Sequence, residues 1–299
     1  MSVSPAASPE RWDELDIARL LTLQPLGPNR WRSVYGDGNM NGRSYGGQLL
    51  GQALMAALMD VPPERTPTAM QFLFLQGAMP EQPIDFEVTE LQQGKRFTSL
   101  HVRGSQGPGR NVLDAHVTCA VALDAPEHSS PSPAPLGERP EDCPGLDDID
   151  PALVRAITRL GGYAQDRKRS IEFRIPDAER QLSAASIGDR FRFWMRATQP
   201  LPDEPRIQAA AFAYLSDWWL NFSSLGMHMR DIGSRNLYIA SLNHALWMHR
   251  PVRPDAWMHV ETSSPCSALG RGFSVGSVHD EQGRAVASLT QECLMAYAD

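Results

Sequence analysis

The stretch Tyr214-Leu-Ser-Asp-Trp-Trp-Leu-Asn-Phe-Ser-Ser-Leu225 places one acid, Asp217, inside an otherwise apolar run that begins at Ala209. Apolar side chains recur through this run at spacings of three and four residues, which is typical of a buried helix. An acid in such a helix must be paired, solvated in a cleft, or neutral. We therefore expect a helix over 209–225, with Asp217 either as a solvated or capping acid at its edge or as a catalytic group.

The composition narrows the class of protein. A length of 299 residues allows two domains or one large one, and a net charge of -7 argues against nucleic acid as the main partner. The four cysteines lie far apart with no CxxC spacing, so they indicate reduced thiols rather than a zinc site or a disulfide framework. The sequence has no recognisable secretory signal and no apolar run of membrane-spanning length. We expect a soluble cytoplasmic protein.

The first half of the chain predicts a strand, then a long helix, then a run of strands. Three- and four-residue apolar spacing predicts helices over 10–23 and 46–59. Alternation of apolar and polar residues predicts strands over 29–35, 68–75, 84–92, 97–104 and 111–123. This order favours the α+β class, with an antiparallel sheet wrapped on one long helix.

A proline-rich segment, 125–150, separates this half from a second one with the same order of elements. In the second half we expect helices over 148–160 and 209–225, and strands over 170–175, 190–197, 237–248, 257–264, 272–279 and 285–297. The chain is therefore predicted to divide into a first unit (1–124), a linker (125–150) and a second unit (151–299).

Two short stretches of the first half resemble stretches of the second half, which supports an internal duplication of the chain. The hexapeptide that begins at Gly94 (Gly-Lys-Arg-Phe-Thr-Ser) resembles the one that begins at Gly270 (Gly-Arg-Gly-Phe-Ser-Val). Tyr45-Gly-Gly-Gln48 likewise resembles Tyr214-Leu-Ser-Asp217. The echoes occur in the same order within the same pattern of elements. Gln48 is therefore expected to occupy the position that Asp217 holds in the second unit.

Three segments resemble the acyl-CoA thioesterase II (TesB-like) family. They are Tyr45-Gly-Gly-Gln-Leu-Leu-Gly-Gln-Ala, Ile239-Ala-Ser-Leu-Asn-His-Ala-Leu-Trp-Met-His-Arg-Pro, and Ala268-Leu-Gly-Arg-Gly-Phe followed by Ala287-Ser-Leu-Thr-Gln-Glu-Cys-Leu-Met. The resemblance implies a double hotdog, in which two tandem units each wrap an antiparallel sheet around a long helix. It also implies hydrolysis of fatty acyl-CoA to free fatty acid and CoA, with no metal or organic cofactor.

The resemblance also implies the catalytic residues. The family holds its hydrolytic water with an Asp, a Ser or Thr, and a Gln, which match Asp217, Ser241 and Gln291. A carboxylate can take the proton of the water, a hydroxyl can orient both acid and water, and an amide can hold the water in place. Attack by Asp217 itself, through an anhydride, is an alternative that the sequence leaves open.

Substrate contacts are predicted at six further positions: Gly46, Gly47, Gln48, Gln71, Lys95 and Arg271. The two glycines allow close backbone approach and are candidate oxyanion donors at a helix start. The two cations are candidates to meet the phosphates of CoA. Gln71 stands where the family usually has a His, and Asn243 stands where it usually has an Asp, so substrate preference and rate are open.

Two other functions compete with the hydrolase. One is a non-catalytic acyl-CoA binding protein, and the other is a hotdog hydratase or dehydratase, which normally needs an Asp/His pair. A Ser/His pair in the 237–248 strand is disfavoured, because regular alternation puts His244 on the opposite face from Ser241. Sheet edges and a broad outer face predict a homodimer or a higher homo-oligomer.

Overall fold

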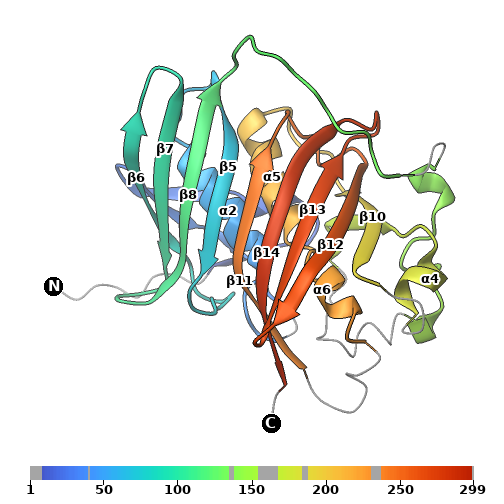
Figure 1. Ribbon diagram of the computed structural model, residues 1–299. Coiled ribbons are helices and arrows are strands. Elements are labelled where there is room, and N and C mark those ends of the chain that lie inside the picture. Colours follow the sequence, from blue (N-terminus) through green and yellow to red (C-terminus); the bar gives the residue numbers. More distant parts are fainter. Residues whose placement is uncertain are drawn as a thin grey trace.

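The computed structural model describes residues 9–39, 41–134, 138–153, 168–183, 188–229 and 237–297. One antiparallel sheet of twelve strands forms the main layer, and the helices α2 (Gly46–Leu58) and α5 (Pro205–Ser216) lie against one of its faces (Figure 1). A separate two-stranded parallel sheet joins β1 (Glu10–Arg11) to β4 (Tyr35–Gly36). The predicted α+β class is confirmed.

The twelve strands fall into two halves with the same internal order. From one edge, the first half runs β2 (Leu23–Gly27), β3 (Arg30–Ser33), β6 (Asp85–Gln93), β7 (Phe97–Ser105), β8 (Asn111–Val121) and β5 (Arg65–Phe74). From the other edge, the second half runs β9 (Ile171–Arg174), β10 (Arg190–Ala197), β12 (Met258–Ala268), β13 (Arg271–His279), β14 (Ala285–Tyr297) and β11 (Leu237–Met248). The repeat predicted from the sequence therefore appears as a repeated strand order.

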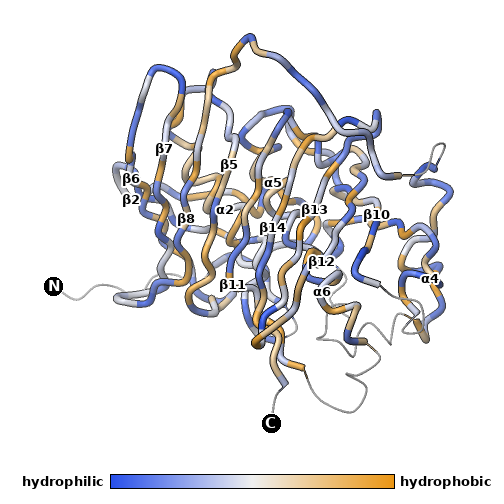
Figure 2. Tube along the Cα trace, viewed as in Figure 1, coloured by the Kyte–Doolittle hydropathy of each residue, from blue (hydrophilic) through white to orange (hydrophobic). Residues whose placement is uncertain are grey.

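The two halves meet at the seam between β5 and β11. Five register pairs, from Asn243 opposite Leu73 to Trp247 opposite Ala69, continue the sheet across it. Along β13, buried residues alternate with exposed ones from Arg271 to Gly276, and Figure 2 shows hydrophobic and hydrophilic residues alternating along the strands. The sheet therefore has one buried face, toward the helices, and one outward face.

Two glycines bring the central helices together. A Cβ added to Gly47 would lie 2.2 Å from the carbonyl oxygen of Tyr214, and one added to Gly51 would lie 2.9 Å from that of Ala210. Residues later in α2 thus meet residues earlier in α5, so the helices run antiparallel. The first turn of α2 consequently lies beside the last turn of α5, which ends next to Asp217.

The helix predicted over 209–225 is in fact two helices. Helix α5 ends at Ser216, and a second, short helix, α6 (Phe222–Gly226), follows a tight turn. Trp219 in this turn has a φ of 58°, in the left-handed region that bulky residues rarely occupy. The turn interrupts the hydrogen-bond ladder of the helix and leaves Asp217 as the C-cap of α5.

Two other helix predictions differ from the structure. Residues 10–23, predicted as one helix, contain β1, the four-residue α1 (Ile17–Leu20) and the start of β2. Residues 154–160 of the helix predicted over 148–160 lie outside the described residues. The short α4 (Ala178–Leu182) and the 3-10 turn η1 (Pro140–Asp142) were not predicted.

The proline-rich segment crosses from the first half of the sheet to the second (Figure 1). It is fastened to the hairpin between β13 and β14, where the Ser129 hydroxyl accepts from Ala285 N at 2.9 Å and Pro131 bridges to Arg284. Among the described residues, no helix combines the length and apolar character needed to cross a membrane.

Candidate active site

Asp217 lies where the two central helices meet. Its carboxylate accepts a hydrogen bond from the backbone N–H of Gly47, in the first turn of α2. The N-terminus of a helix favours a negative charge, because its first N–H groups have no partner within the helix. A Cβ on Gly46 would lie 2.5 Å from Oδ2 of Asp217, so glycine leaves the room that the carboxylate occupies.

The side-chain amide of Gln291 connects the three residues predicted to hold the water. The Nε2 atom of Gln291, in β14, donates to Oδ1 of Asp217 at 2.8 Å and to the hydroxyl oxygen of Ser241, in β11, at 2.7 Å. Asn221 Nδ2 approaches the same hydroxyl oxygen at 3.5 Å. Gln291 is fully buried. The structure therefore brings Asp217, Ser241 and Gln291 into one hydrogen-bonded group.

A β-bulge adds a fourth residue to this group. The register between β11 and β14 shifts between Ser241 and Asn243, so that Ser241 pairs with Cys293 but His244 pairs with Gln291. The extra residue restores His244 to the buried face that Ser241 shares. The prediction that His244 lies on the opposite face was wrong, because it assumed unbroken alternation along the strand.

Counting donors fixes the orientation of the buried side chains. Both hydrogens of the Gln291 amide are used by Asp217 and Ser241, so Oε1 faces Nδ1 of His244, 3.3 Å away, as an acceptor. Nδ1 then carries the proton of a neutral imidazole. Nε2 accepts from the Ser216 hydroxyl at 3.0 Å, for which the Ala213 carbonyl at 2.8 Å competes.

Burial shifts the pKa values of the two titratable side chains in this group, Asp217 and His244. It raises the pKa of Asp217 from 3.8 to about 6, against the hydrogen bonds from Gln291 and Gly47, which lower it. It lowers the pKa of His244 to about 4, against the hydrogen bond to Gln291, which raises it. At neutral pH the group therefore holds a carboxylate with a raised proton affinity and a neutral imidazole.

Aromatic side chains surround the acid. Phe173 stacks on Trp218 and Trp219, with ring centroids 5.7 and 4.7 Å apart, and Tyr45 meets the edge of Trp218 at 5.7 Å. The aromatic cluster belongs to the buried region in which Asp217 lies, and burial raises the pKa of this acid.

Of the predicted substrate contacts, the structure brings only the two glycines to Asp217. The N–H of Gly47, predicted as an oxyanion donor, donates to the Asp217 carboxylate. Gln48 belongs to a separate buried network, in which its amide accepts from Asp37 N at 2.7 Å and donates to Gln52 Oε1 at 3.1 Å.

The other three positions lie elsewhere. Gln71 is exposed on β5 between the buried residues Met70 and Phe72, and so points to the outward face. Arg271 is also exposed and pairs with Glu292 at 3.0 Å. Lys95 lies in the turn beside Arg65, at the opposite end of β5 from Phe74, whose ring lies against Gly46.

Asn243, the other departure from the family pattern, also lies outside the group. Its amide donates to Glu292 Oε2 at 3.0 Å across the strands. Both residues lie on the outward side of the sheet, because the adjacent residues along the two strands, His244 and Gln291, point inward. Asn243 therefore leaves the hydrogen bonds around Asp217 unchanged.

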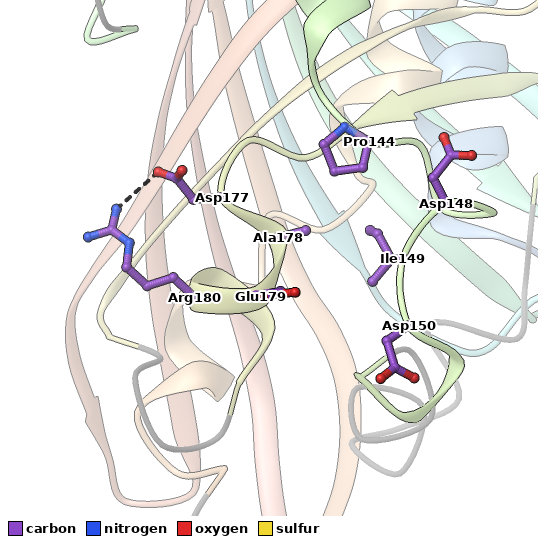
Figure 3. A pocket seen from close by; sticks show the side chains of 8 residues that line it. All are labelled: Pro144, Asp148, Ile149, Asp150, Asp177, Ala178, Glu179 and Arg180. Atoms are coloured by element: carbon purple, nitrogen blue, oxygen red, sulfur yellow. Dashed lines mark ion pairs between the residues drawn. The ribbon is translucent and has the colours of Figure 1, made fainter.

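A separate cavity of about 490 Å³ lies between the linker and α4 (Figure 3). Its lining is acidic, with an ion pair between Asp177 and Arg180 at 3.5 Å. The residues that line it are Pro144, Asp148, Ile149, Asp150, Asp177, Ala178, Glu179 and Arg180. It shares no residue with the group around Asp217.

Comparisons with known proteins agree with this arrangement. Residues 36–123 match the model of the acyl-CoA thioesterase N-terminal domain, and residues 140–295 match that of the acyl-CoA thioesterase C-terminal domain. The chain is similar to acyl-CoA thioesterase 2 of Haemophilus influenzae, with 24% identity over 259 residues, which is 85% of this chain and 88% of that protein.

Solved structures show the same architecture. Acyl-CoA thioesterase II TesB2 from Mycobacterium marinum has a TM-score of 0.77 and 27% identity, covering 95% of this chain and 99% of that one. A protein of unknown function with a hot dog fold from Alicyclobacillus acidocaldarius has a TM-score of 0.74 at 16% identity, covering 95% and 98%, and shows the fold alone. The predicted family, double hotdog and thioester hydrolase are confirmed. The chain belongs to the acyl-CoA thioesterase family.

Proposed function

We propose that Asp217, Ser241 and Gln291 together hold the water that hydrolyses a fatty acyl-CoA to a free fatty acid and CoA. The observation that carries the proposal is the single buried amide of Gln291, which donates to both the carboxylate and the hydroxyl. This amide holds the Asp217 carboxylate, which is an acceptor, and the Ser241 hydroxyl near each other, so that both can contact one water and fix its position.

The chemistry follows from the charges. The carboxylate of Asp217 removes a proton from the water as its oxygen bonds to the thioester carbonyl carbon. The tetrahedral intermediate then collapses, the C–S bond breaks, and the protonated Asp217 returns the proton to the CoA thiolate. A pKa of about 6 suits both steps near neutral pH, because the group accepts a proton readily and releases it readily.

His244 is a positioning residue in this scheme. It touches neither the water nor the substrate, but its Nδ1–H holds the oxygen of the Gln291 amide. Without that donor the amide could rotate and present its oxygen to the carboxylate, which repels it. The Ser216 hydroxyl keeps the imidazole in the required tautomer.

The first test is thiol release from a panel of short to long acyl-CoAs by the wild type and Asp217→Asn. Turnover by the wild type and its loss in the variant support the proposal. Binding of acyl-CoA without turnover by either would favour the non-catalytic binding protein, and hydration of an enoyl-CoA without thiol release would favour the hydratase.

A single turnover in water labelled with oxygen-18 tests for an anhydride that water opens at the Asp217 carbonyl; an anhydride opened at the acyl carbonyl labels the fatty acid, as general-base attack does. General-base attack puts the label in the fatty acid. An anhydride opened at the Asp217 carbonyl puts it in the protein, where mass spectrometry of the peptide around Asp217 detects it.

We further propose that the protein acts in the cytoplasm and self-associates through the outward face of the sheet. The cysteines Cys119, Cys143, Cys266 and Cys293 are all free thiols, as a reducing compartment favours. Large apolar side chains are exposed on the strands at the middle of the sheet: Leu73, Trp247, Phe273 and Val275. Light scattering after gel filtration of the wild type and Trp247→Glu tests the association.

The division into units 1–124 and 151–299 joined by a linker also stands as a proposal. The second unit supplies Asp217, Ser241 and Gln291, whereas the first supplies Gly46 and Gly47, which shape the place of the acid. On this division the site is completed across both units. Limited proteolysis that cuts first within 125–150 would support it.

A further inference from the structure

Three side chains of the kinds that ligate metals meet on the outward face of the first half of the sheet. They are His101, on β7, and Asp114 and His116, on β8. One ligand atom from each can be chosen so that all lie within 4.8 Å of one another. Nothing in the hydrolytic group accounts for them, because that group lies on the buried face.

The strand register explains why they converge. His101 and His116 are directly opposite each other in the ladder between β7 and β8. Asp114 precedes His116 by two residues, so it projects from the same face of the sheet. Their neighbours Val102, Ala115 and Val117 are buried, which places the three ligands on the outside.

The distances are close to those of a coordination sphere. His101 Nε2 lies 2.9 Å from Asp114 Oδ2, and the two imidazole rings are 5.1 Å apart with a 39° angle between their planes. Ligand atoms around a tetrahedral zinc ion are about 3.3 Å apart. His116 is exposed, so its side chain has room to change rotamer when an ion binds.

The neighbouring arginine does not occupy the Asp114 carboxylate, which is therefore available to a bound cation. Arg103 is the register neighbour of Asp114, but its guanidinium donates to Glu87 Oε2 at 2.9 Å on the other side. On the next strand, the exposed amide of Gln71 lies opposite His116. The ligands therefore stand among polar side chains.

We propose that His101, Asp114 and His116 bind a divalent transition-metal ion such as Zn²⁺ or Cu²⁺. Two imidazole nitrogens and one carboxylate oxygen suit these ions and do not suit Mg²⁺ or Ca²⁺, which prefer oxygen ligands alone. Three protein ligands leave at least one position for water. The expectation that hydrolysis needs no metal is unaffected, because this site and Asp217 lie on opposite faces of the sheet.

Calorimetric titration with Zn²⁺ tests the proposal on tag-free protein stripped with a chelator. All variants carry Cys266→Ser, which removes the exposed thiol. One equivalent is expected to bind, and His101→Asn, Asp114→Asn and His116→Asn should each weaken binding at least about tenfold. His128→Asn, an exposed histidine in the linker, is the matched control and should bind as the parent does.

Electron paramagnetic resonance of the protein loaded with Cu²⁺ gives a second readout. Splitting from two imidazole nitrogens is expected, falling to one in either histidine variant. Acyl-CoA hydrolysis, measured on the same samples with and without metal, should not change and reports that each variant is folded. The proposal is overturned if Zn²⁺ does not bind the folded protein, or if binding is equally strong in the three variants and in His128→Asn.

Discussion

His244 and Gln291 lie directly opposite each other on β11 and β14, with 3.3 Å between the imidazole Nδ1 and the amide Oε1. The bulge at Ser241–Asn243 creates this pairing. It links Ser216, through the imidazole of His244, to the amide that donates to Asp217. We therefore propose that His244 helps to hold the geometry of the acid without contacting it.

Replacing His244 tests that control. His244→Leu removes the N–H that holds the Gln291 amide, and we expect kcat to fall about 10- to 100-fold while KM changes little. His244→Asn keeps an N–H donor and should recover part of the loss. Steady-state kinetics measure both, with His249→Asn, which bonds Ser288 outside the site, as the control. Full kcat in the leucine variant would contradict the assigned role.

The rate should depend on pH through Asp217. Because burial raises the pKa of this acid to about 6, its basic form accumulates as the pH rises through that value. We expect kcat/KM to increase with pH in a single titration centred near 6 and then to level off. Profiles of thiol release between pH 5 and 8 measure it, and a flat profile would argue against a carboxylate base.

Asp217 should also cost stability at neutral pH. Its folded pKa is raised above that of the unfolded chain, so the folded state is favoured below the unfolded value and loses that advantage as the pH rises through about 6. We therefore expect Asp217→Asn to be more stable than the wild type at pH 7, by about 3 kcal/mol. Denaturant unfolding at pH 7 and at pH 4 measures this, and the difference should shrink at the lower pH.

A methyl group at position 46 should displace the acid. A Cβ there would lie 2.5 Å from Asp217 Oδ2 and 3.1 Å from the ring of Phe74, so Gly46→Ala must move the carboxylate. We expect kcat/KM to fall at least about tenfold. Gly188→Ala, where a Cβ meets nothing within 4 Å, is the matched control for the substitution. Equal activity of the two variants would mean that the carboxylate tolerates the shift.

Much of the fold could be read from the sequence, because the sheet has one buried face and alternation marks it. The strands at 237–248 and 285–297 were predicted within a residue, and they carry Ser241 and Gln291 to neighbouring positions. The local pattern could not show the bulge after Ser241, since a bulge changes the pairing partner without changing the apolar character of the strand.

The break in the helix after Ser216 was hidden for a similar reason. Apolar residues at helical spacing continue after the break, at Trp218, Trp219 and Phe222, and the sequence does not show that Trp219 adopts a left-handed conformation.

Gln71 was predicted as a substrate contact from the family resemblance, and the structure places it on the outward face of β5; a match in sequence position does not say which face of the strand carries the side chain. The sequence could mark Gly47 as a candidate site residue, because glycine allows close backbone approach. Its hydrogen bond to Asp217 could not be predicted, because it depends on how the two helices pack.

The seam between β5 and β11 joins two halves that belong to one polypeptide. In a pair of separate subunits, the glycines of one copy and the acid of the other would meet only as often as protein concentration allowed. Here the tether holds them at a high effective concentration that dilution does not change. The assembly of the site is therefore insensitive to how much of the protein a cell makes.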